Sequence, residues 1–405
     1  MRLSPSAARR RRGSTLPLTA LLMPFIIALV ALSVDLGWII SVRCQMQAAA
    51  DSAALAGAQQ LLNNNYLKGT ASTGTATDAA MSAARTAAQK FAAKNYGGGV
   101  SLTLPDNANN ASTGDIVCGY LATPTTYTQT MTYSQPGVGP YPNSVQVTVR
   151  RDSLQNGSLG LFFAPYLGMR SFNLTARATA TYEGGINGFA IDTPGYSTCK
   201  LLPFALDVNT WNQVLAGSGP DAFTRNAATG AVTAGADGIH ECKLYPLSNG
   251  NGSGNSGLPP GNFGTVDIGS ANNSTADLKR QIQFGPNATD LSYFAGGKLQ
   301  LDPTTGTLTL QGDTGVSAGM SAALDSIIGQ PRIIPLYSSV SGPGNNAQYT
   351  IVGFAGVTVL EEVLTGSLSS KHLTIQPCWC IDANALGGST SGVSYFLVKP
   401  LALTR

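Results

Sequence analysis

This sequence carries few charged residues. Charged residues make up 11% of its 405 residues, against about 25% in a typical soluble domain. No cluster of carboxylates, no phosphate-binding loop and no basic-aromatic patch stands out along the chain. These absences argue against a charge-rich helical enzyme. The 47 glycines and the abundant Asn, Ser and Thr instead favour strands joined by many turns.

The few charges are unevenly placed. Of the 24 basic residues, five arginines fall in the first dozen positions, where no acidic residue occurs. Removing these five leaves 19 basic against 21 acidic residues, a net charge of −2 for the remainder of the chain. The protein is therefore not globally basic, and nucleic acid is not an expected partner.

The basic block precedes a long apolar run. Residues 14–34 carry no charge, and 21 helical residues span about 31 Å, close to the thickness of a hydrocarbon core. We predict a transmembrane helix over 14–42, with Trp38 near the outer interface and Pro24 as the site of a kink. Arg43 follows directly after this span.

The positive-inside rule gives the orientation. Residues 1–13, with Arg9, Arg10, Arg11 and Arg12, are expected in the cytoplasm, and residues 43–405 outside it. A signal peptide cleaved near Ala48-Ala49-Ala50 is the alternative, but the apolar run exceeds the usual 7–15 residues of such a signal. Asp35 lies close enough to the interface for solvation to explain it better than a functional role.

Two Ala-rich helices are expected in residues 43–99. The first covers 43–62, and Ala50, Ala54, Gly57 and Leu61 recur on it at helical spacing. Such a face of small side chains lets another backbone approach closely, and we expect it to be a contact surface for a partner protein, although high helix propensity alone explains it equally well. The second helix is predicted over Thr77–Asn95.

From residue 100 the apolar period changes to two, which indicates strands over Val100–Leu104, Ser144–Val149 and Phe172–Tyr182. Residues 100–185 are predicted to form a small α+β unit, with a boundary at Gly184-Gly185. Residues 186–405 are predicted to form a larger β-rich domain. The chain is thus assigned to the α+β class, with an N-terminal transmembrane helix that continues into Ala-rich helices before a β-rich extracytoplasmic region. Further expected elements are a short helix over Met320–Ile328 and strands over Thr307–Leu310, Arg332–Tyr337, Tyr349–Leu360 and Leu373–Pro377.

The N-terminal segment also resembles TadG-like proteins of the Tad (tight adherence, Flp pilus) assembly system. The resemblance rests on the Arg-rich segment before Gly13, the apolar run that ends Val34-Asp35-Leu-Gly37, and the block Ala50-Asp51-Ser-Ala-Ala-Leu-Ala-Gly-Ala58. It implies a bacterial inner-membrane protein that binds other pilus-assembly proteins outside the membrane and serves cell adhesion. It implies neither a cofactor nor a small-molecule substrate.

Two departures limit what the resemblance implies. Many relatives carry a von Willebrand A domain whose metal site needs Asp-x-Ser-x-Ser, and no such run occurs here. TadE-like pseudopilins carry Glu five residues after the Gly at which they are processed, and Leu18 holds that place. Cleavage by a prepilin peptidase is therefore not expected. A pilin-like filament subunit nevertheless stays an alternative.

An exported hydrolase is a further alternative. Gly315-Val-Ser317-Ala-Gly319 fits the G-x-S-x-G nucleophile elbow, and Asp325 and His372 follow in the order of such hydrolases. Without the regular alternation of strands and helices that hosts this elbow, chance is the better explanation. We assign no catalytic residue, and the protein is not expected to be an enzyme.

The chain has six cysteines, which in an exported protein are compatible with disulfides. Cys199 with Cys242 is the first choice of pair, although spacing does not determine connectivity. A zinc set of His240, Cys242, Cys378 and Cys380 is the other option. It is disfavoured because one residue between paired ligands is tighter than the usual two to four. No metal-binding residue is assigned.

Overall fold

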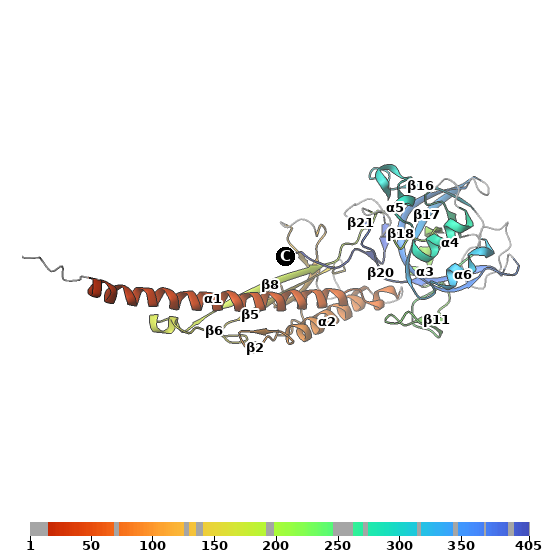
Figure 1. Cartoon of the computed structure of the whole chain (residues 1–405). Helices are drawn as coiled ribbons and strands as arrows, with labels where there is room; N and C mark the ends of the chain where they lie inside the picture. Colours follow the sequence, from red (N-terminus) through yellow and green to blue (C-terminus); the bar gives the residue numbers. More distant parts are fainter. Residues whose placement is uncertain are drawn as a thin grey trace, which may run out of the picture.

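The computed structural model describes residues 15–68, 73–124, 129–134, 141–191, 198–245, 262–269, 274–313, 317–342, 347–367, 370–387 and 393–404. The molecule is elongated. A long helix runs from a projecting N-terminal half into a sheet, and a larger β domain lies beyond the end of that helix (Figure 1). The α+β class is confirmed.

Helix α1 (Thr15–Gln60) joins the predicted anchor and the first Ala-rich helix in one unbroken element. Ala, Leu and Gln favour helix throughout, and the helix continues through Pro24. Its character changes at Val42. From there to Leu61, residues at three- and four-residue spacing are buried: Val42, Met46, Ala49, Ala50, Ala53, Ala54, Ala58 and Leu61.

Helix α2 (Thr73–Ala92) follows the 3₁₀ turn η1 (Asn64–Leu67). It starts four residues before and ends three residues before the predicted helix. It lies along the C-terminal half of α1 (Figure 1). Ala84 and Ala88 are fully buried between the two helices.

A five-stranded antiparallel sheet packs on the C-terminal half of α1. Its strand order is β24-β8-β5-β3-β4. The bounds are β3 Ile116–Tyr120, β4 Thr132–Tyr133, β5 Ser144–Arg151, β8 Leu174–Thr181 and β24 Ala402–Leu403. Val145, Val147 and Val149 alternate along β5 and share one core with α1, as a half-buried strand should. The last strand brings the end of the chain back beside Thr181.

Two small hairpins extend this first unit. One is β1 (Tyr96–Gly97) with β2 (Val100–Ser101), shorter than the strand expected from residue 100. The other is β6 (Leu159–Gly160) with β7 (Ser171–Phe172), and the 3₁₀ turn η2 (Ala164–Leu167) forms its tip. This second hairpin lies beside the projecting half of α1 (Figure 1).

The larger domain is built on an eight-stranded mixed sheet of order β13-β19-β18-β16-β14-β10-β17, with β22 beside β18. Strand β17 also pairs with β18, so β18, β16, β14, β10 and β17 close a ring. The bounds are β10 Phe204–Asp207, β13 Cys242–Leu244, β14 Phe263–Val266, β16 Leu308–Asp313, β17 Pro331–Ser341, β18 Ala347–Val363, β19 His372–Pro377 and β22 Val393–Tyr395. All four predicted strands are present, each longer than expected or shifted at its ends.

Short elements surround this ring. The helical ones are α3 Val208–Leu215, α4 Thr275–Phe284, α5 Ala288–Leu291, η3 Ala295–Gly297, η4 Ala318–Met320 and α6 Ser321–Asp325. The strands are β9 Gly188–Ala190, β11 Phe223–Arg225, β12 Val232–Ala234, β15 Lys298–Gln300, β20 Cys380–Ile381, β21 Ala385–Leu386 and β23 Leu397–Val398. The predicted helix over Met320–Ile328 is thus a 3₁₀ turn followed by one short helix.

The predicted disulfide is wrong. All six cysteines are free. Cys199 packs in one hydrophobic cluster of the larger domain and Cys242 in the other. Successive residues of β10 divide in the same way, with Phe204 in the cluster of Cys242 and Ala205 in the cluster of Cys199. Because successive side chains of a strand point to opposite faces, the two thiols lie on different sides of the sheet.

Aromatic rings connect the two units. Trp379, beyond β19, contacts Tyr66 of η1 with ring centroids 6.1 Å apart and Tyr182 at 6.3 Å. Its indole N–H donates to the Asn63 carbonyl at 3.1 Å. Phe396 adds contacts to Tyr66 and Trp379. The larger domain is therefore packed against the end of α1 and η1.

Candidate membrane-proximal site

The projecting half of α1 is apolar on all sides. Most of its large side chains are between 45% and 67% exposed. They are Leu18, Leu21, Leu22, Met23, Phe25, Ile26, Ile27, Leu29, Val30, Leu32, Val34, Leu36 and Ile40. By length and composition this helix is able to cross a membrane, which suggests a membrane anchor. Arg9 to Arg12, predicted to set its orientation, lie outside the described residues.

Asp35 is the one acidic residue in this half, and it is 2% exposed. Its carboxylate accepts three backbone N–H groups, from Phe162 at 2.8 Å, Phe163 at 3.0 Å and Ala164 at 2.6 Å. The preference for solvation as the explanation of Asp35 is therefore wrong. The side chain binds the chain itself.

Local geometry explains why the hairpin offers these donors. Pro165 is the second residue of the 3₁₀ turn η2, and Gly168 caps its end with a positive φ of 92° that favours glycine. The first N–H groups of a helical turn have no partner within the turn and attract negative charge. Phe163, at the cap position, makes no side-chain capping bond, and Asp35 supplies the acceptor from α1.

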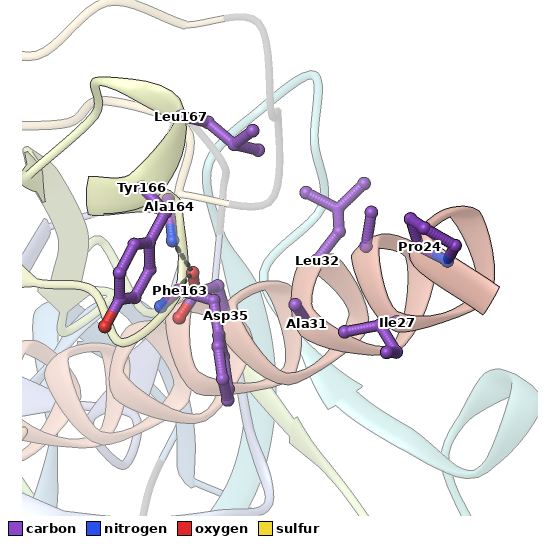
Figure 2. Close-up of a pocket in the computed structure, with 10 residues that line it drawn as sticks. Pro24, Ile27, Ala31, Leu32, Asp35, Phe163, Ala164, Tyr166 and Leu167 are labelled. Carbon is purple, nitrogen blue, oxygen red and sulfur yellow. Dashed lines mark hydrogen bonds between the residues drawn. The ribbon is translucent and has the colours of Figure 1, made fainter. Parts of the chain in front are cut away.

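An open pocket lies between the hairpin tip and α1, with a volume of about 430 Å³. Figure 2 shows Pro24, Ile27 and Leu32 of α1 with Leu167 of η2 around it, and Asp35 bonded to Ala164 at its inner end. Its walls are almost wholly apolar. Asp35 is the only charged residue among the described side chains that line it.

The flanking anchor residues take different places. Trp38 is half-buried, and its ring centroid lies 5.7 Å from that of Phe162. It therefore packs against Phe162 of this hairpin as well as against the core of the first unit. Arg43 is exposed, one residue past the buried Val42.

The small-residue face is used inside the chain. Ala50, Ala54 and Leu61 are 0% exposed. A Cβ added at Gly57 would lie 3.1 Å from the Ala84 carbonyl oxygen and 3.1 Å from a methyl of Val145. These small residues thus allow α2 and the sheet to pack closely against α1. Their burial disagrees with the expectation that this face meets a second protein.

The hydrolase alternative gains no support from the described residues. Ser317 caps η4 by accepting the Gly319 N–H at 3.2 Å. The ring of His372 contacts the Glu361 carboxylate at 3.2 Å and the Ser370 carbonyl at 2.8 Å. Gly315 lies outside the described residues, so the elbow itself is not seen.

The zinc alternative is not supported either. Within the described ranges, no three His, Cys, Asp or Glu side chains gather as metal ligands. Cys242 and Cys380 belong to different hydrophobic clusters. Burial raises the pKa of Cys380 to about 12, a shift opposite to the one that favours thiolate ligands.

Comparison with known proteins bears on the same segment. Residues 13–60 match the Tad family model, described as Flp pilus-assembly, TadE/G-like. Residues 13–60 are thus similar to the N-terminal segment of TadE/G-like pilus-assembly proteins. Residues 56–180 match a second model, Tad_C, described as Tad-like Flp pilus-assembly.

These two matches confirm the resemblance seen at the N-terminus and extend it to residue 180. They cover α1, α2 and the sheet from β3 to β8, including the hairpin that binds Asp35. No curated protein and no solved structure shows a significant match to the chain.

Proposed function

We propose that the protein is an anchored assembly component of a Tad (Flp) pilus, held in the inner membrane by the projecting half of α1. In this arrangement its N-terminus is cytoplasmic and residues 43–405 lie outside. The observation that carries the proposal is the division of α1. One half is apolar and exposed all round, and the other is buried against the sheet that the pilus-assembly match covers.

The family matches also favour a structural role over an enzymatic one. The protein would act through contacts with other pilus-assembly proteins. Because the small-residue face of α1 is covered by the chain itself, those contacts need other surfaces, such as the larger β domain. That domain is joined to the end of α1 through Trp379, so it is presented at a defined place relative to the anchor.

A deletion strain tests this function. Loss of the chain should abolish Flp pili on the cell surface, and wild-type protein should restore them. Ser317→Ala should restore them equally, because Ser317 only caps a short turn. A chain that begins at Arg43 behind a cleaved signal should fail. Normal piliation without the protein would contradict the proposal.

A filament subunit is the second candidate, because the exposed apolar half of α1 would be buried equally well among copies of itself. Leu18 at the place where pseudopilins carry Glu argues against it. Mass spectrometry of the mature protein separates the two. A new N-terminus at Ser14 and recovery of the chain in sheared pili would favour the filament.

A further inference from the structure

The hairpin from Leu159 to Phe172 has a tip whose large apolar side chains are exposed. We infer that this tip, residues 162–169, is a second membrane contact that enters the outer leaflet beside α1. The inference rests on the proposed anchoring of α1. Its ligand is the lipid surface itself.

The composition of the tip fits that environment. The chain carries no charged residue from Ser153 to Met169. Apolar and aromatic side chains of the tip are nevertheless turned outward. Their exposed fractions are 59% for Phe162, 43% for Phe163, 89% for Tyr166, 76% for Leu167 and 55% for Met169. A contiguous apolar patch of this kind marks a contact with membrane or protein.

The depth of the tip follows from Asp35. The helix from Thr15 to Val34 has 20 residues, about 30 Å at 1.5 Å each, so Asp35 stands at the outer end of a full membrane span. The three bonds to Asp35 hold the start of η2 at that level. From there the tip extends alongside the apolar half of α1, as the pocket shared by Leu167 and Pro24 shows (Figure 2).

The residues around the tip have the distribution of an interfacial segment. Trp38 and Phe162 lie in contact near the level of Asp35, where aromatic rings are favoured at a membrane surface. Arg170 follows Met169 directly and is exposed, so its long side chain is able to reach the headgroups. At the base of the hairpin the Ser158 hydroxyl donates to Asn173 at 2.7 Å. The hairpin thus has its apolar tip beside the membrane-spanning part of α1 and its polar base farther along the helix, on the outer side.

Lipid is favoured over a protein partner because the patch is continuous with the apolar span. Leu167 and Tyr166 share the pocket with Ile27, Ala28 and Leu32, all residues of the span itself. Any molecule surrounding these α1 residues also surrounds the tip. A bilayer does so without a further component, and acyl chains adapt to a pocket open on one side.

Such a tip gives α1 a second point of attachment. A single helix leaves the outer part of a protein free to rotate and tilt about its axis. A tip fixed to one side of that helix by Asp35 would hold the five-stranded sheet, and the domain beyond it, in one orientation over the membrane.

Cysteine labelling and depth-dependent quenching test the inference. Cys44 is the one exposed cysteine in the structure, so Cys44→Ser removes the background. Into this full-length chain Leu167→Cys, Leu29→Cys or Tyr293→Cys is introduced, labelled with an environment-sensitive fluorophore and reconstituted in phosphatidylcholine–phosphatidylglycerol vesicles. Leu29 reports on the anchor, and Tyr293, 65% exposed in the larger domain, is the aqueous control.

Bromine on the lipid acyl chains should quench the labels at Leu167 and Leu29 to a similar extent and leave Tyr293 unaffected. Quenching at Leu29 without quenching at Leu167 would overturn the membrane contact of the tip while the anchor stands. Quenching at neither position would remove the proposed anchoring as well. A label at Leu167 that is protected from aqueous iodide but insensitive to brominated lipid would show that a second copy of the chain covers the tip, and would likewise overturn the inference.

Discussion

Replacing Gly57 with leucine tests whether the small-residue face of α1 is an internal contact. Gly57 is buried at the crossing of α1 with α2 and β5. An added Cβ already meets the Ala84 carbonyl oxygen and a methyl of Val145 at 3.1 Å each, and Ala88 at 3.6 Å. The three further carbons of leucine have no space without moving one of these elements.

The magnitude follows from two opposing terms. Overpacking in a tight core costs about 1–3 kcal/mol of stability. We expect a cost near the upper end of this range, because the Ala84 carbonyl oxygen belongs to the backbone and cannot move aside as a side chain can. Replacing glycine in a helix returns about 0.8–1 kcal/mol. The net loss for Gly57→Leu is therefore about 2 kcal/mol. For Gly57→Ala, where only the Cβ is added, the two terms should nearly cancel.

Thermal unfolding in detergent measures this effect. If the N-terminal unit unfolds as one unit of roughly 170 residues, 2 kcal/mol corresponds to a midpoint about 4–8 °C lower. Gly37→Leu is the matched control on the same helix, because nothing lies within 4 Å of the Cβ position at Gly37. An unchanged midpoint for Gly57→Leu, with weaker capture of partner proteins, would refute the internal packing and restore the face as an interface.

Three further predictions concern the Asp35 hydrogen bonds, the contact of Trp379 between the two units, and the cysteines. Asp35→Asn leaves a single acceptor oxygen for three N–H donors, so hydrogen exchange at the first amides of η2 should become about tenfold faster or more. Asp51→Asn, which affects only a bond to a glutamine on the same helix, should leave exchange there unchanged. Trp379→Ala should cost about 1–3 kcal/mol at the junction and split unfolding into two transitions, where an unchanged single transition would contradict the coupling. Maleimide should add once to the folded protein, at Cys44, and six times after denaturation without reductant, whereas four adducts would indicate a disulfide.

The sequence predicted best those elements whose signal is local and periodic. The apolar run and the Ala-rich stretch after it were both expected as helix, and α1 contains both. Alternation identified most of β5 and all of β8, since one face of each strand packs on α1 while their edges pair within the sheet. The strand over Tyr349–Leu360 was recognised for the same reason, although β18 extends to Ala347 and Val363.

Contacts between distant parts of the chain were missed. Nothing local marks Ala402–Leu403 as the edge strand beside β8, because two residues carry no period and the pairing spans more than two hundred positions. The closing of a ring by β17 and β18 is likewise a property of the whole sheet.

For the candidate site, too, the local feature was visible in the sequence and the long-range contacts were not. Asp35 stood out as an acid beside an apolar run, but its partners were out of reach of sequence reasoning. One signal was present, a short apolar stretch with Ala-Pro at its centre, where Pro165 predicts the start of a helical turn with free N–H groups. Linking that turn to Asp35 requires the long-range pairing of β5 and β8, which places the hairpin beside α1.

The central claim is that α1 crosses the inner membrane with the rest of the chain outside. Cys44 tests it most directly, because it follows the span by two residues past Val42 and is the one exposed thiol in the structure. A membrane-impermeant maleimide added to spheroplasts should label the wild-type chain. A Ser6→Cys, Cys44→Ser variant should be labelled only after the inner membrane is permeabilised. Labelling of Cys44 solely in inverted vesicles, or of both positions from the outside, would contradict the account.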